Sequence, residues 1–347
     1  MKTTVGLWGS GWRAEYFLRV AKYLPDSFEI SGLITRSDEK AARFTQEFGV
    51  KCYKTLDDFL LNEKAPAFMV VSVTASKNVE FSLDLLNRGI PVLLETPPAT
   101  NLADLDHFQG KLPADAKIQI AEQYPFHPMH LAQHEFIKSG KLGEIQFAQV
   151  SFSHAYHGVG LIRRFLGVGI EDAQITATQF PINVMGGTTR GGEPTKEEIV
   201  QKTQTIAVLK FPNNKTGLLN FELDQHRSWV RSSIIQIKGT HGEIFNSKIK
   251  YLHDYKTPIE TDLVRKHLGI EDNFEGVDLK GILADGKWLY KNPYVGSRLV
   301  DDEIAVATCM SGMAEYVKGV APFYSLQDAS HDTKLGILIE QAIADSN

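Results

Sequence analysis

The sequence predicts two domains: an α/β domain built on a parallel sheet, followed by an α+β domain in which longer strands dominate. The first 120 or so residues alternate short apolar strands with amphipathic helices, as a parallel sheet covered on both faces requires. After Tyr124 the strands lengthen, and several alternate apolar and polar residues, as in a sheet with one open face. We place the boundary within residues 121–125, which gives domains 1–122 and 123–347.

The first domain opens with a strand over residues 3–8 and an amphipathic helix over residues 12–24. Later helices carry their own signals, with Thr55 as a cap and Gly49 and Gly89 as stops. The remaining expected strands are 28–35, 67–74, 91–95 and 117–124, and the remaining expected helices are 39–49, 55–62, 78–89 and 102–112. Such an alternation predicts a parallel sheet with helices on both faces.

The second domain begins with a helix over residues 126–143 and ends with a helix over residues 325–347. Between them we expect strands at 144–153, 204–211, 216–225, 232–240 and 242–253. The glycine-rich stretch 185–198 is typical of a mobile loop.

Composition narrows the function. Hydrophobic residues make up 43% of the 347 residues and charged residues 23%, the profile of a soluble globular protein. The net charge of −5 gives no reason to expect a nucleic-acid or membrane partner. Cys52 and Cys309 are far apart and suit a reducing compartment. With neither a secretory leader pattern nor an apolar run near 20 residues, we expect a cytoplasmic protein with a small-molecule partner.

A glycine loop follows the first strand. Gly9, Gly11 and Ala14 fit the G-x-G-x-x-A pattern, directly between a strand and a helix. Gly9 permits the tight turn, Gly11 allows a pyrophosphate to approach the backbone, and Ala14 keeps helix and strand close. The helix N-terminus then offers free N–H groups to phosphates, so Ser10, Trp12 and Arg13 are candidate cofactor neighbours. The alternative is a tight turn without a ligand.

The end of the second strand bears on the choice of cofactor. NAD sites usually place an acidic residue there for the ribose 2′-hydroxyl. Here the strand ends Thr35-Arg36-Ser37, and the first acid, Asp38, comes too late. A guanidinium beside hydroxyls suits a 2′-phosphate, so NADP is favoured over NAD, with Arg13 as a second positive contact. The alternative is that Arg36 is a solvated loop residue.

The order of these signals resembles a known family. After the glycine loop come TRSDEKAARFTQEFGV, VVSVTAS, GIPVLLETPPA, PFHPMHLAQHEFIKSGKLGEI and a terminal SLQDASHDTKLGILIEQAI. This pattern resembles the Gfo/Idh/MocA oxidoreductases over nearly the whole chain. The resemblance implies a Rossmann domain followed by an α+β domain with a large, open, mostly antiparallel sheet. It implies a nicotinamide at the domain interface and substrate under the sheet. It also implies a homodimer or homotetramer formed through the open sheet.

The resemblance also fixes which residues lie along the cofactor and which family residues are missing. The cofactor neighbours it implies are Thr74, Ala75, Glu95, Thr96 and Gln123. The family's Glu-Lys-Pro motif stands here as Glu95-Thr96-Pro97, so its proton-carrying lysine is replaced. Val79 stands where a histidine is usual, and Gly160 replaces an aspartate. A threonine hydroxyl can orient a substrate oxygen, but it is a poor acid or base near pH 7.

His157 is the histidine that survives at a family-matched position, and imidazole titrates near neutral pH. We interpret it as a general acid and substrate contact; the alternative is a structural residue at a helix start. Tyr124 could donate a proton or contact substrate, or could pack as an aromatic at the hinge. Arg163 matches an arginine often found in the family, and Arg164 shares the helical face of His157; both are candidate substrate contacts.

Three histidines on the helix after the boundary, His127, His130 and His134, lack the carboxylate partner of a metal motif. We interpret them as surface residues and predict no metal site. The expected function is NAD(P)-dependent hydride transfer on a small polar metabolite of the sugar or polyol kind. The alternative is a dinucleotide-binding sensor with weak or no catalysis.

Overall fold

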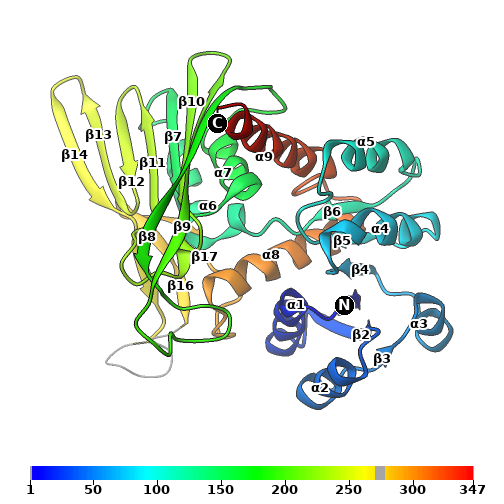
Figure 1. The fold of residues 1–347 in the computed structure, drawn as a ribbon. Helices are drawn as coiled ribbons and strands as arrows, with labels where there is room; N and C mark the ends of the chain where they lie inside the picture. The colour runs from blue at the N-terminus through cyan, green and yellow to red at the C-terminus, as the bar shows by residue number, and fades with distance from the viewer. Residues whose placement is uncertain (1, 270–277, 347) are drawn as a thin grey trace. The chain divides into compact units, whose positions relative to one another are not determined.

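The computed structural model describes residues 2–269 and 278–346, and the chain divides into two compact units (Figure 1). Unit 1 contains Met1–Pro128, Arg265–Gly281 and Lys291–Ser330, and unit 2 contains the rest. The first crossing point is therefore Pro128 rather than 122, and two later segments return to unit 1. One cause is main-chain pairing, because Ile120 N–H donates to the Tyr324 carbonyl at 3.0 Å.

Unit 1 is built on a six-stranded sheet in the order β3-β2-β1-β4-β5-β6, with every neighbouring pair parallel. The strands are β1 (Thr3–Trp8), β2 (Phe28–Ile34), β3 (Cys52–Tyr53), β4 (Phe68–Val71), β5 (Val92–Leu94) and β6 (Ile118–Ile120). This order is the doubly wound Rossmann arrangement, in which ligands bind at the carboxyl ends of the strands. The predicted parallel sheet is confirmed; the two-residue strand β3 was not predicted.

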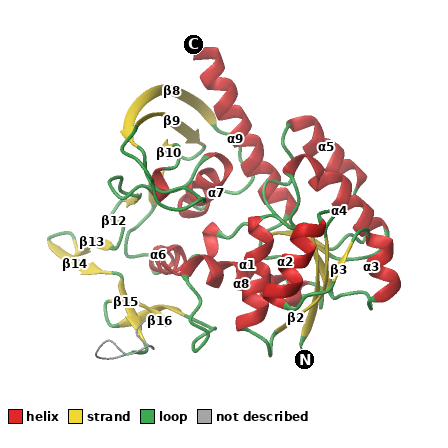
Figure 2. Cartoon of the chain, turned by 60° about the horizontal axis from the view of Figure 1, so that its bottom comes forward, coloured by secondary structure: helices red, strands yellow, loops and turns green. Residues whose placement is uncertain are grey.

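Helices lie on both sides of this sheet, as Figure 2 shows in red beside the yellow strands. They are α1 (Trp12–Tyr23), α2 (Asp38–Phe48), α3 (Leu56–Asn62), α4 (Asn78–Asn87) and α5 (Leu102–Lys111). Short polar side chains cap three of them: the Ser37 hydroxyl accepts from Lys40 N–H, and Thr55 and Asn101 act likewise. A further helix, α8 (Asp301–Tyr316), packs against α1 and was not predicted.

Unit 2 is built on an eight-stranded sheet in the order β14-β13-β12-β11-β7-β10-β9-β8. Only β7 and β10 run parallel; the other neighbours are antiparallel. The strands are β7 (Ile145–Ser151), β8 (Gln174–Met185), β9 (Ile199–Phe211), β10 (Lys215–Glu222), β11 (Ile234–Gly239), β12 (Gly242–Phe245), β13 (Lys248–Asp254) and β14 (Thr257–Asp262). The predicted large, mostly antiparallel sheet is confirmed.

Helix α7 (Ala155–Leu166) packs on β7 and β10, where apolar side chains such as Ala148 and Leu219 are buried. Helix α6 (Pro128–Lys138) precedes β7, and α9 (Leu326–Ser346) ends the described chain. A small sheet joins β15 (Val264–His267), β16 (Leu279–Ala284) and β17 (Lys287–Lys291). Among the described residues, no helix combines the length and apolar character needed to cross a membrane.

Candidate functional site

The two glycines of the loop after β1 differ in what surrounds them. Gly9 has a φ of +127°, and a Cβ there would lie 2.0 Å from the Ser72 carbonyl oxygen, so the fold itself requires glycine. Gly11 has an ordinary φ of −77°, and a Cβ there would meet no described atom within 4 Å. The protein alone does not demand glycine at position 11. The open space beside its backbone fits a group that must approach closely, such as a pyrophosphate.

The end of β2 lies beside this loop. The Ser10 and Thr35 hydroxyls are 2.7 Å apart, and Ser37 N–H donates to the Thr35 hydroxyl at 3.4 Å. The Arg36 side chain is exposed. Lys54 Nζ donates to the Arg36 carbonyl at 3.3 Å and forms an ion pair with Asp38. Lys54 therefore places a second cation at this strand end, which sequence reasoning missed because β3 was not predicted.

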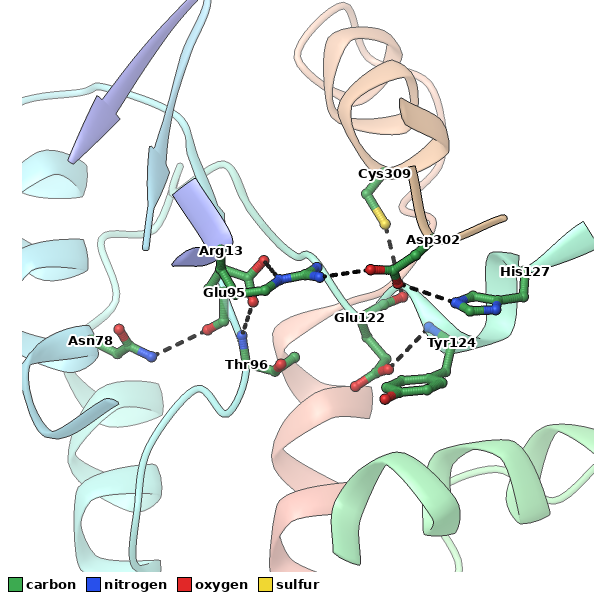
Figure 3. A network of polar contacts seen from close by, with 9 residues as sticks. All are labelled: Arg13, Asn78, Glu95, Thr96, Glu122, Tyr124, His127, Asp302 and Cys309. Carbon is green, nitrogen blue, oxygen red and sulfur yellow. Dashed lines mark hydrogen bonds and ion pairs between the residues drawn. The ribbon is translucent and has the colours of Figure 1, made fainter. Parts of the chain in front are cut away.

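The Arg13 guanidinium is paired with two carboxylates in this structure. Its Nε donates to Glu95 Oε1 and its Nη1 to Asp302 Oδ2, both at 3.2 Å (Figure 3). Its side chain is only 12% exposed. Burial opposes the charge of Arg13, but the two carboxylates outweigh it and raise its pKa. Asp302 lies 289 positions away, so this pairing was not foreseeable from local sequence, and the cofactor contact of Arg13 stays a prediction.

The turn after β5 is held from two directions. Asn78 Nδ2, from the start of α4, donates to the Glu95 carbonyl at 3.2 Å and to the Pro97 carbonyl at 2.7 Å. Thr96 N–H donates to Glu95 Oε2 at 3.3 Å, and Figure 3 shows these groups around the turn. Burial raises the pKa of the Glu95 carboxyl, although Arg13 works against that shift. Asn78 thus supports the turn that carries Thr96. Asn78 itself directly precedes Val79, the position where the family usually has a histidine.

The residues after β4 and β6 come to the same edge of the sheet, because parallel strands share the direction of their carboxyl ends. Thr74 precedes the short 3₁₀ helix at Ala75–Lys77 that follows β4. Gln123 follows β6 and is buried. The structure therefore brings the cofactor candidates Thr74, Ala75, Glu95, Thr96 and Gln123 to one edge.

A second carboxylate, Glu122, lies at the end of β6 and is 3% exposed. Tyr124 N–H donates to its Oε1 at 3.2 Å, and the Cys309 thiol donates to its carbonyl at 3.8 Å (Figure 3). Burial raises the pKa of the Cys309 thiol well above its usual value. Sequence reasoning missed Glu122, although it follows a buried strand just as Glu95 does.

Tyr124 and His127 stack with ring centroids 5.4 Å apart and nearly parallel planes. His127 Nε2 lies 3.3 Å from Asp302 Oδ1, so Asp302 joins this stack to Arg13. Burial alone would raise the pKa of Asp302, but the hydrogen bond from His127 and the charge of Arg13 lower it. The prediction that His127 is a surface residue is wrong, because its side chain is 13% exposed and paired with a carboxylate.

His157 lies in the first turn of α7. It is buried, with the rings of Tyr156 and His154 centred 4.2 Å and 5.3 Å from its own. His154 also lies 6.2 Å from Phe221 between ring centroids. The three rings lie together where the chain passes from β7 into α7.

The two predicted arginines of α7 have different surroundings. Arg163 is buried; its Nη1 donates to Asp332 at 2.5 Å and its Nε to the Gly169 carbonyl at 2.9 Å. These contacts tie the end of α7 to α9 within unit 2, and they commit Arg163 to a structural ion pair. Arg164 is partly buried on the same helix.

The two histidines that lie within α6 are also not surface residues. His130 is buried, with the Phe152 ring 4.8 Å away, and His134 is partly buried. Burial, together with the charge of Arg164, lowers the pKa of His134 to about 4. In the described part of the chain, no group of three or more His, Cys, Asp or Glu side chains is arranged to hold a metal ion.

Residues 3–118 match the model of a family described as an oxidoreductase family with an NAD-binding Rossmann fold. YteT of Bacillus subtilis (strain 168), whose name places it among the oxidoreductases, is 21% identical over 145 residues. That match covers 40% of this chain and 34% of the relative, so the chain matches about a third of the relative's length.

Solved structures with the same fold cover essentially the whole chain. An oxidoreductase from Agrobacterium radiobacter in complex with NAD+, L-tartaric acid and magnesium is 14% identical, with a TM-score of 0.71 and coverage of 100% and 98%. The scyllo-inositol dehydrogenase of Lactobacillus casei is 14% identical, with a TM-score of 0.66 and coverage of 100% and 97%. Biliverdin reductase of Synechocystis sp. PCC 6803, solved with biliverdin and NADP+, is also 14% identical, with a TM-score of 0.64 and coverage of 99% and 99%.

Proposed function

Because the chain belongs, through its Rossmann domain, to the Gfo/Idh/MocA family of oxidoreductases, we propose that it transfers hydride between a nicotinamide dinucleotide and a small polar metabolite. The substrate class that we favour is a sugar or polyol derivative. The inositol dehydrogenase among the structural neighbours shares this fold, and that neighbour's name supports the class without fixing the substrate.

The observation that carries the proposal is the open space at Gly11. A Cβ at this position would meet nothing in the described protein, yet the position lies between β1 and the N-terminus of α1. Helix N–H groups that point into open space beside a bare backbone suit a pyrophosphate. The strand order of unit 1 puts this loop at the switch point of the sheet, between β1 and β4.

We favour NADP over NAD as the cofactor. Arg36 is exposed at the end of β2, and Lys54 donates to its carbonyl, so two cations are available for a 2′-phosphate. Asp38 is paired with Lys54 rather than directed at a ribose diol, as far as the described contacts go. Both features argue against the usual recognition of NAD, in which a carboxylate binds the ribose hydroxyls.

The chain's own residues supply orientation and proton handling, and the nicotinamide, when bound, exchanges the hydride. Asn78 and Arg13 hold the turn that carries Thr96, whose hydroxyl can orient a substrate oxygen. His157 can give a proton to a developing alkoxide. Tyr124 remains a proposed donor beside the nicotinamide. Arg164 remains a proposed substrate contact, whereas Arg163 is better explained by its ion pair with Asp332.

The second candidate function is a dinucleotide-binding sensor, and Thr96 in place of the family lysine is the observation that favours it. A panel of sugars and polyols assayed with NADP+ and NAD+ separates the two candidates. Thr96→Lys serves as the comparison, because it restores the family's proton carrier. Turnover by the wild-type protein supports the enzyme. An inactive wild type beside an active Thr96→Lys variant supports the sensor and contradicts our proposal.

We also propose that copies associate through the open face of the unit 2 sheet, as a homodimer or homotetramer. Large apolar side chains on β8 and β9, including Phe180, Met185 and Ile199, are 41–62% exposed in the single chain. Light scattering in solution would report the assembly.

A further inference from the structure

The proposed function leaves one chemical gap, because the position of the family lysine is occupied by a threonine that cannot carry a proton near pH 7. A titratable group lies one strand away. We propose that Glu122, at the end of β6, rather than His157, is the acid/base residue of this chain at the nicotinamide end of unit 1, and that His157 acts by hydrogen bonding to the substrate. This inference rests on the proposed hydride transfer.

The register of the sheet places Glu122 level with Thr96. Leu94 of β5 pairs with Ile120 of β6, in parallel. Thr96 and Glu122 each follow their paired residue by two positions. Adjacent strands lie about 4.8 Å apart, so residues at the same level on neighbouring strand ends are neighbours in space. Glu122 therefore stands beside position 96, on the edge where a parallel sheet binds its ligand.

The surroundings of Glu122 keep its carboxylate in place. It is 3% exposed, and Tyr124 N–H donates to one oxygen. Figure 3 shows its carboxylate, the Thr96 side chain and the Tyr124 ring turned to the same side. Glu95 is held by its ion pair with Arg13 and by the Thr96 N–H, which donates to its Oε2. Of the two strand-end carboxylates, Glu122 is the one that accepts from Tyr124 N–H.

The groups drawn with Glu122 in Figure 3 include Arg13 on α1, Glu95 after β5, Tyr124 and His127 after β6, and Asp302 and Cys309 on α8. Among these, Glu95 and Cys309 interact electrostatically with Glu122. The negative charge of Glu122 is among the causes that raise the pKa of Glu95, so the two carboxylates interact. Arg13 is shared between Glu95 and Asp302.

The proposed reaction balances in bonds, electrons and protons. In the oxidising direction, the C–H bond of the alcohol breaks and its hydrogen leaves with both electrons to the oxidised nicotinamide. The O–H bond breaks and its proton goes to the Glu122 carboxylate, while a C=O bond forms. The substrate is oxidised by two electrons and the cofactor is reduced by two. Glu122 then releases the proton to solvent, and reduction runs through the same steps in reverse.

Binding calorimetry tests this placement without a substrate. The oxidised ring is positively charged and attracts the Glu122 carboxylate, whereas the reduced ring is neutral and does not. NADPH binding should therefore take up more protons than NADP+ binding, measured in buffers of different ionisation enthalpy between pH 6 and 8. The 2′-phosphate titrates alike in both cofactors, so the difference in proton uptake reports the effect of the nicotinamide ring alone.

Glu122→Gln should abolish the difference in proton uptake and lower the ratio of NADP+ to NADPH affinity roughly tenfold, the equivalent of one pKa unit. The exposed Asp115→Asn is the charge-matched control and should keep the difference. Glu122→Asp keeps the charge and should also keep the difference in proton uptake. If the glutamine variant does not fold, this variant is the one that tests the assignment of Glu122.

Equal proton uptake for both cofactors in the wild type, or an unchanged difference in Glu122→Gln, would overturn the assignment of Glu122 while leaving cofactor binding intact. A wild type that binds neither cofactor would overturn the proposed function, and this inference with it.

Discussion

At the scale of single residues, the candidate site combines a glycine that the fold requires with a glycine that it does not. Gly9 is required because a side chain there would collide with Ser72, whereas Gly11 faces open space. Arg163 lies at a family-matched position but is bound to Asp332 inside unit 2. A match to a motif therefore needs the contacts of the side chain before a role is assigned to it.

His157 is the residue of unit 2 on which turnover should depend most. His157→Ala should lower turnover by roughly 100-fold, the usual contribution of a placed acid, if His157 rather than Glu122 carries the substrate proton. NADPH affinity should hardly change, because the phosphate loop belongs to unit 1. Steady-state rates and a cofactor titration on the same preparations give both numbers.

His157→Asn refines the test. It should match the alanine variant if proton transfer is the role, and the wild type if only a hydrogen bond matters. Full turnover in both variants would mean that His157 is a structural residue at the start of α7.

At the scale of elements, α8 determines what the phosphate-loop helix can do. Asp302 of α8 receives Arg13 from α1 and pairs with His127 after β6. Through its bond to Glu95, Arg13 also supports the turn after β5. The contacts of Asp302 also fix the stack of His127 on Tyr124. The carboxyl ends of β5 and β6 are thus held by one helix distant in sequence.

Asp302→Asn should destabilise the protein at neutral pH by roughly 2–4 kcal/mol, because it leaves Arg13 with one carboxylate fewer in a buried setting. The pKa of Asp302 is lowered in the folded state. Its stabilisation is therefore present above the ordinary carboxyl pKa of about 3.9 and is lost as the pH falls below it.

Urea unfolding of wild type and Asp302→Asn at several pH values checks this. The gap between the two midpoints should stay constant from pH 7 to pH 5 and narrow below about pH 4. Asp115→Asn, an exposed change of the same kind, should leave the midpoint unchanged. A gap that widens toward acid would contradict the assigned ion pairs.

Local signals predicted most of residues 1–122 well, because the longer strands and helices there carry apolar patterns and three of the helices carry a side-chain cap. The stretch 242–253 was expected as one strand, but Asn246, with a φ of 55°, turns it into the β12–β13 hairpin. Strand β8 was not predicted, because most of its side chains are exposed and it contains a proline, Pro181. The contacts of Arg13 and the burial of His130 depend on partners far along the chain, and no local pattern reports these. Glu122 was within reach, since it follows a buried strand as Glu95 does.

At the scale of the whole molecule, the chain leaves unit 1 after Pro128 and returns to it for residues 265–281 and 291–330. The returning segments include α8 and the main-chain partner of β6 at Tyr324. The sheet edge that carries the candidate cofactor residues is therefore supported by segments far apart in the sequence. The central requirement of the proposed dinucleotide site is still the loop between β1 and α1, and every chemical role proposed for the chain depends on a cofactor held there.

The most direct test is a fluorescence titration of NADPH and NADH against wild type, Gly11→Ala, Gly110→Ala and Arg36→Ala. A Cβ meets no described atom within 4 Å at either glycine, so both alanine variants should fold normally. We predict that only Gly11→Ala loses cofactor affinity, that wild type binds NADPH more tightly than NADH, and that Arg36→Ala removes most of that preference. Unchanged NADPH binding in a folded Gly11→Ala protein, or no binding by the wild type, would contradict a dinucleotide site at this loop.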